Sequence, residues 1–190
     1  MNPAESLTAE AGRSHRDAAI ALAAPFLGVP GDLTAVGYGD LPSSYQTLLA
    51  HAGHMTVTLE AWHESLVDVR VAGETLPDDD AEGHHYTRHS LLTRRSDGRV
   101  VQSGVMRIAL TGLPDAVRDA VTRGGCPLGR ILIRSNLLRE VEPLALWRIE
   151  PGPMLAEELS TDPGEVIYGR TARILVEGRP AVELLEIVKP

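Results

Sequence analysis

Apolar and polar residues alternate along several short stretches of the chain, and this period of two predicts β-strands. Within the stretch 66–71, three valines alternate with Asp68 and Arg70. Turn signals at residues 96–98 (SDG) and 177–178 (EG) separate such stretches and predict hairpins. The strands predicted in this way span 66–71, 86–95, 99–110, 141–150, 166–176 and 181–188, with a weaker one over 55–60.

Helical patterns lie at the start and in the middle of the chain. Ser14, and Ser43 or Ser44, offer the hydroxyl of an N-cap, and Pro114 suits a first helical turn. Strands joined mostly by hairpins, with helices grouped apart from them, predict an α+β fold with one antiparallel sheet and helices on one side. The predicted helices span 14–27, 43–53, 113–123 and 154–159; the predicted irregular stretches are a loose polar start over 1–12, a turn-rich segment over 31–42 and a solvated loop over 73–83.

The segment from Cys126 to Ser135, CPLGRILIRS, combines a bend with an apolar run. Pro127 fixes the angle at which the chain enters the bend, and Gly129, which has no side chain, allows another group to approach the backbone closely. Such a turn can aim N–H groups at an anion. A plain turn with no ligand is the alternative interpretation.

Composition narrows the function classes. The 190 residues carry a net charge of −8, which argues against a nucleic-acid partner, so an anionic ligand would have to be held by local arginines. A single cysteine, Cys126, fits a reducing cytoplasm, and no apolar run is long enough for a signal peptide or membrane span. Lys189 is the only lysine, which argues against Schiff-base or P-loop chemistry.

Two charged residues stand among aliphatic ones in predicted strands. Arg88 shares a strand face with Ser90 and Leu92, and either extends to solvent or pairs with a buried anion. Glu186 shares a face with apolar residues of the last strand. It suits proton transfer or a hydrogen bond to a hydroxyl group, unless the strand edge leaves it in water. Arg170 and its neighbour Arg173 have opposite phase, so at most one of them faces a common pocket.

The histidines raise the question of a metal site. His51, His54 and His63 form one group, and residues 84–89 contain three more. Neither group has the spacing of a zinc signature, and no cysteine pair accompanies them. We therefore expect no metal, and Cys126 has no motif that marks it as a nucleophile.

Four motifs occur in a fixed order: LLAHAGHMT, YTRHSLL, CPLGRILIRS and YGRTARILVEGRPAVELLEIVKP. In this order they resemble the chorismate pyruvate-lyase (4-hydroxybenzoate synthase) family over residues 45–190. The resemblance implies one α+β domain over 1–190, with residues 1–40 as a poorly matched extension. It also implies helices that cover an internal ligand cavity, and a reaction that needs neither a cofactor nor a metal.

The resemblance further implies a lyase that eliminates pyruvate from chorismate to give 4-hydroxybenzoate. Arg88 would bind a substrate carboxylate, and Glu186 would address the opposite polar end of the ring. Met55 and Leu128, with Gly129 beside it, would supply backbone contacts at the cavity wall. One residue is inserted before Glu186 relative to the family pattern, so Glu183 is a rival for its place.

Two alternatives follow from the same resemblance. One is an enzyme of this fold that acts on another small carboxylate; the other is a non-catalytic small-molecule-binding protein. A related fold serves as the effector-binding domain of transcription regulators, but no DNA-binding helix pair is evident in this sequence. The expected partner is a small-molecule carboxylate substrate, with no nucleic acid and no membrane.

Overall fold

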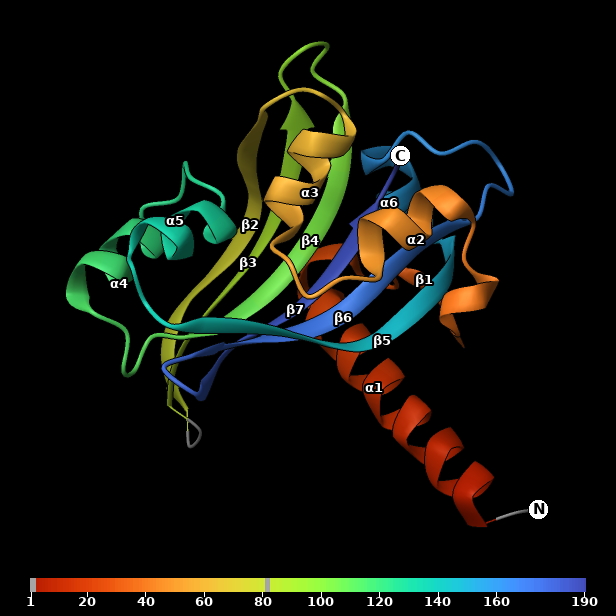
Figure 1. Ribbon diagram of the computed structural model, residues 1–190, viewed down its shortest axis with the longest axis horizontal. Helices are drawn as coiled ribbons and strands as arrows, with labels where there is room; N and C mark the ends of the chain where they lie inside the picture. Colours follow the sequence, from red (N-terminus) through yellow and green to blue (C-terminus); the bar gives the residue numbers. More distant parts are fainter. Residues whose placement is uncertain (1–2, 81–82) are drawn as a thin grey trace.

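The computed structural model describes residues 3–80 and 83–190, which form one seven-stranded sheet (Figure 1). Every neighbouring pair of strands is antiparallel, in the order β1-β5-β6-β7-β4-β3-β2. This confirms the predicted α+β fold with a single antiparallel sheet. The strands are β1 (Gly31–Val36), β2 (Val67–Asp80), β3 (Gly83–Arg94), β4 (Val100–Ala109), β5 (Arg139–Pro151), β6 (Ile167–Val176) and β7 (Arg179–Val188).

Hairpins set the register of the central strands. Glu177 and Gly178 both have positive φ, of 51° and 73°, which matches the twist of a two-residue hairpin between β6 and β7. A bulge then shifts the register, because Ile174 pairs with Val182 whereas Leu175 pairs with Pro180. The extra residue displaces every later pair of this hairpin by one position.

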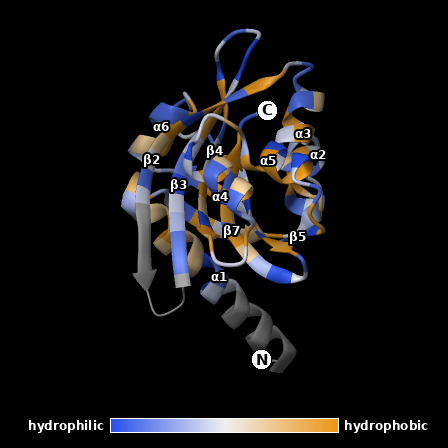
Figure 2. Ribbon diagram, turned by 90° about the vertical axis from the view of Figure 1, so that its left-hand side faces the viewer, coloured by the Kyte–Doolittle hydropathy of each residue, from blue (hydrophilic) through white to orange (hydrophobic). Residues whose placement is uncertain are grey.

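Helices cover both faces of the sheet rather than one. Helices α1 and α6 pack on one face, and α2, α3, α4 and α5 lie on the other (Figure 2). The first part of α1 projects away from the sheet (Figure 1). The helices are α1 (Pro3–Leu27), α2 (Ser43–Leu49), α3 (Met55–Trp62), α4 (Asp115–Thr122), α5 (Leu128–Arg134) and α6 (Pro153–Glu158), with a 3-10 turn over Tyr38–Asp40.

The face covered by four helices has two apolar clusters. Helices α2 and α3 pack on one cluster, which includes Leu92 of β3. Helices α4 and α5 pack on the other, which includes Met106 and Leu184 of the central strands. The seam between these clusters is where the buried polar residues of this face lie.

Several local predictions were wrong. Residues 55–60, predicted as a weak strand, belong to helix α3. The predicted loose start belongs to α1 from Pro3, part of the turn-rich segment is β1, and β2 continues to Asp80 through most of the predicted loop. Residues 81–82 of that loop and 1–2 of the predicted start lie outside the described residues. Among the described helices, none is long and apolar enough to cross a membrane.

Candidate functional site

A small cavity lies at the seam, between the sheet and the N-termini of α3 and α5. We call it the Arg88 cavity; its polar lining comprises His54, Thr56, Arg88, Ser90, Gln102 and Glu186. Its apolar lining includes Met55, Leu92, Met106, Leu128, Ile174 and Leu184. The cavity measures about 40 Å³.

Arg88 is fully buried on β3, and no carboxylate of the described residues lies within hydrogen-bond distance of it. Its Nη1 donates to the carbonyl of Val121 at 3.2 Å, at the end of α4, while Nε and Nη2 have no partner among the described residues. Those two nitrogens form the edge of the guanidinium that binds both oxygens of one carboxylate. Burial lowers the pKa of Arg88, and Tyr86, Cys126 and Glu74 oppose that shift.

A second arginine on the same face is satisfied by the protein itself. Arg170 of β6 donates from Nε to Oε2 of Glu186 at 2.8 Å, and both side chains are buried. Its other nitrogens donate to the carbonyls of Leu49, His51 and Gly53 at 3.3, 2.6 and 3.2 Å. Arg170 therefore neutralises Glu186 and fixes the loop between α2 and α3.

The N-termini of two short helices form the cavity wall opposite the sheet. Neither α3 nor α5 has a side-chain N-cap, and the first N–H groups of a helix have no partner within it. Gly129 lets the two ends meet, since a Cβ there would lie 3.3 Å from Cβ of His54 and 3.4 Å from Oγ1 of Thr56. The close approach predicted for Gly129 is therefore to helix α3.

His54, at the start of α3, is held as a neutral imidazole. Its Nε2 accepts a hydrogen bond from Nε of Arg139 at 3.0 Å, which leaves the ring proton on Nδ1. Burial is the main cause that lowers the pKa of His54, and the charge of Arg139 adds to it. His54 therefore adds no positive charge to the cavity.

A row of paired residues crosses the cavity floor. Ser90 of β3 pairs with Gly104 of β4, which pairs with Glu186 of β7, which pairs with Arg170 of β6. The hydroxyl of Ser90 and the carbonyl oxygen Oε1 of Gln102 are buried without partners among the described residues. The sequence analysis missed Gln102 and gave Arg170 no role. The one signal that could have found them is strand alternation, which places each of them on the same strand face as buried residues.

The five residues predicted from the sequence meet at this one cavity. Arg88, Glu186, Met55, Leu128 and Gly129 all line it. Their role in binding stays a prediction.

The residues that competed with them lie elsewhere. Glu183 is 66% exposed and lies 3.9 Å from Arg107, so it is not in the cavity. Arg173 is also exposed and pairs with Glu142. Among the described residues, no three His, Cys, Asp or Glu side chains lie close enough together to hold a metal ion.

No protein-family model and no curated protein matches the sequence. Solved structures share the fold. The effector domain of PhnF from Mycobacterium smegmatis matches with a TM-score of 0.52 at 12% identity, over 72% of this chain and 88% of that domain. The structure of PhnF itself gives 0.52 at 13% identity, over 73% of this chain and 64% of PhnF.

Two further structures match in the same way. A protein classed as a transcriptional regulator from Streptomyces coelicolor has a TM-score of 0.50 at 13% identity, over 66% of this chain and 88% of that one. The ligand-binding domain of a protein classed as a GntR-family transcriptional regulator from Bordetella bronchiseptica has 0.47 at 13% identity, over 65% and 85%. The likeness establishes the fold of this chain.

These structures correct the functional prediction. The assignment to the chorismate pyruvate-lyase family is wrong, and so are the enzyme class and the chorismate, pyruvate and 4-hydroxybenzoate chemistry, because the matching structures are an effector domain and a transcriptional regulator. The cavity gives a physical reason: Glu186, which the lyase prediction assigned to the substrate, is already bound by Arg170. The predicted absence of a nucleic-acid partner has no support either, since one neighbour is a transcriptional regulator.

Proposed function

We propose that this chain is a non-catalytic domain that binds a small carboxylate in the Arg88 cavity. The observation that carries the proposal is the free edge of Arg88, where Nε and Nη2 are buried and unpartnered. A buried guanidinium edge without a hydrogen-bond acceptor is costly, and a carboxylate satisfies both nitrogens at once. The effector domain of PhnF, whose fold is similar, supports a ligand-responsive function by analogy of fold alone.

Charge balance favours a monoanion. Arg170 and Glu186 neutralise each other, and His54 is neutral, so Arg88 contributes the one uncompensated charge among the described lining residues. A carboxylate cancels that charge, whereas a doubly charged phosphate would leave a buried net charge of −1. The N-terminal amides of α3 and α5 add partial positive charge on the opposite wall.

The size of the cavity limits the ligand. A volume of about 40 Å³ lies well below the 300 Å³ or more of a typical drug-sized pocket. The cavity therefore accepts a ligand of a few non-hydrogen atoms, and we expect a larger one to require α3 and α5 to separate.

Titration calorimetry with sodium propanoate tests the proposal. The wild-type protein should bind one propanoate per chain, and Arg88→Met should weaken binding by about 2–5 kcal/mol, as expected when one partner of a buried charge pair is removed. Arg99→Met is the matched control, because the Arg99 side chain is 78% exposed and lies outside the cavity. Equal binding by wild type and Arg88→Met would place the anion elsewhere.

A further inference from the structure

The cavity floor also has a hydrogen-bond acceptor without a donor. Gln102 is 4% exposed, and its Oε1 has no partner among the described residues. An unpaired buried carbonyl is unfavourable, and a ligand that brings an O–H or N–H removes that penalty. Gln102 therefore favours a ligand with a hydrogen-bond donor, which Arg88 alone does not require.

Gly104 leaves the space that the amide of Gln102 occupies. A Cβ on Gly104 would lie 2.8 Å from Nε2 and 3.8 Å from Cδ of Gln102, so the Gln102 amide rests where a side chain at 104 would be. Gly104 pairs with Ser90 on one side and with Glu186 on the other. The Gln102 amide thus lies in the middle of the polar row, between the neutral ion pair and the strand of Arg88.

Resting on the carboxylate site proposed above, we infer that the ligand is a small hydroxy-carboxylate whose hydroxyl group donates to Gln102. Arg88 and Ser90 are two positions apart on one strand face, a separation of about 7 Å. The carboxylate and the hydroxyl are therefore separated by only a few bonds. A hydroxyl suits the site better than an ammonium group, because a second positive charge would stand unpaired beside Arg88.

Gln102 is then the residue that determines specificity, while Arg88 supplies most of the affinity. The unpaired Ser90 hydroxyl, which can donate or accept, completes the contacts with the same ligand. A carboxylate without a hydroxyl group fills the Arg88 edge but leaves Oε1 of Gln102 buried and unpaired.

Three probes of nearly equal size test this inference by calorimetry: lactate, 3-hydroxypropanoate and propanoate. For the wild type, at least one hydroxylated probe should bind about tenfold or more tightly than propanoate. In Gln102→Met the preference for a hydroxylated probe over propanoate should fall to within about twofold. Gly104→Ala should have the same effect, since its Cβ displaces the amide, and it covers the case in which Gln102→Met does not fold.

The outcomes separate the two proposals. Equal binding of all three probes to the wild type, or a hydroxyl preference that survives both variants, overturns the role of Gln102 while the carboxylate site stands. Absence of binding by all three probes overturns the carboxylate site and this inference together.

Discussion

Arg88 and Arg170 are the same residue type on the same face of one sheet, and their roles are opposite. Arg170 is surrounded by one carboxylate and three carbonyls of the protein, whereas Arg88 has one carbonyl. The sequence placed both in strands but could not distinguish them, because strand phase says which face a side chain takes and not which partner it meets. The partner of Arg170 depends on the bulge in β7, without which it would pair with the residue before Glu186.

Three partly buried histidines predict a pH dependence of stability. Burial is the largest cause that lowers the pKa values of His51, His54 and His63 below that of the unfolded chain, which is about 6.5. At a pH between the folded-state pKa values and about 6.5, these histidines bind more protons in the unfolded chain than in the folded one. Their contribution to the free energy of unfolding is therefore fully present above about pH 6.5 and is lost as the pH falls through the folded-state pKa values.

Urea unfolding at a series of pH values between 7.5 and 5 checks this prediction. The free energy of unfolding should decrease toward pH 5 in the wild type, and His54→Asn should show a shallower decrease. A free energy of unfolding that stays constant or rises toward pH 5 would show that the histidines are as easily protonated in the folded state.

At the scale of elements, the two helices that cover the cavity were the least predictable part of the fold. Residues 56–58 are Thr-Val-Thr, a β-branched run that favours a strand, yet they lie in α3. Tertiary packing outweighs that preference, because Met55, Thr56 and Leu59 fall on the buried side of the helix. The hairpins were predictable because their turn residues act locally, whereas α3 and α5 depend on contacts with distant strands.

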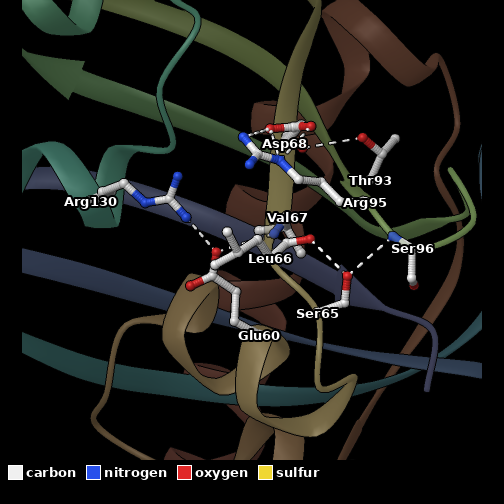
Figure 3. A network of polar contacts seen from close by, with 9 residues as sticks. All are labelled: Glu60, Ser65, Leu66, Val67, Asp68, Thr93, Arg95, Ser96 and Arg130. Atoms are coloured by element: carbon white, nitrogen blue, oxygen red, sulfur yellow. Dashed lines mark hydrogen bonds and ion pairs between the residues drawn. The ribbon is translucent and has the colours of Figure 1, made fainter.

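An ion pair joins these two helices. Glu60 of α3 accepts from Arg130 of α5, and the same Oε1 accepts from the backbone N–H of Val67 at 3.1 Å (Figure 3). A second pair, Asp68 with Arg95, lies nearby but joins β2 to the turn after β3 (Figure 3). The first pair resists separation of the two helices, and the second does not.

Glu60→Gln should therefore speed entry of propanoate into the cavity. The amide oxygen keeps the bond from Val67, while the loss of the ion pair should lower stability by about 0.5–1 kcal/mol and raise the association rate severalfold. Stopped-flow measurement of that rate is the test, with Arg95→Gln as the matched control that leaves the helix pair intact. Identical association rates in both variants would mean that α3 and α5 do not control entry.

At the scale of the whole molecule, the sequence predicted the architecture far better than the activity. Period-two patterns and turn residues specify an antiparallel sheet through local physics, and the structure has that sheet. The motifs that suggested a lyase lie in strands, turns and short helices of the same fold, which also occurs in an effector domain. Fold-level likeness cannot separate these functions; the partners of individual buried groups can.

The unpaired edge of Arg88 should destabilise the free protein, and a bound carboxylate should remove that penalty. Arg88→Met should therefore raise the free energy of unfolding of the free protein by about 1–2 kcal/mol, since it removes a buried guanidinium whose Nε and Nη2 have no partner among the described residues. Arg170→Met should lower it by about 3–5 kcal/mol, because it leaves Glu186 buried and unpaired. Both variants change a buried arginine on the same sheet face, so the opposite signs are specific to the partners.

The most direct test is urea unfolding of the wild type and Arg88→Met with and without propanoate. Without propanoate, Arg88→Met should be the more stable protein. At a propanoate concentration of about 100 times the wild-type dissociation constant, the wild type should gain about 2.7 kcal/mol. The variant, which binds about 2–5 kcal/mol more weakly, should gain less than about 1 kcal/mol, so its stability advantage should disappear. If Arg88→Met is less stable than the wild type without propanoate, and both proteins gain equally when it is added, Arg88 is a structural residue and the account of the cavity is wrong.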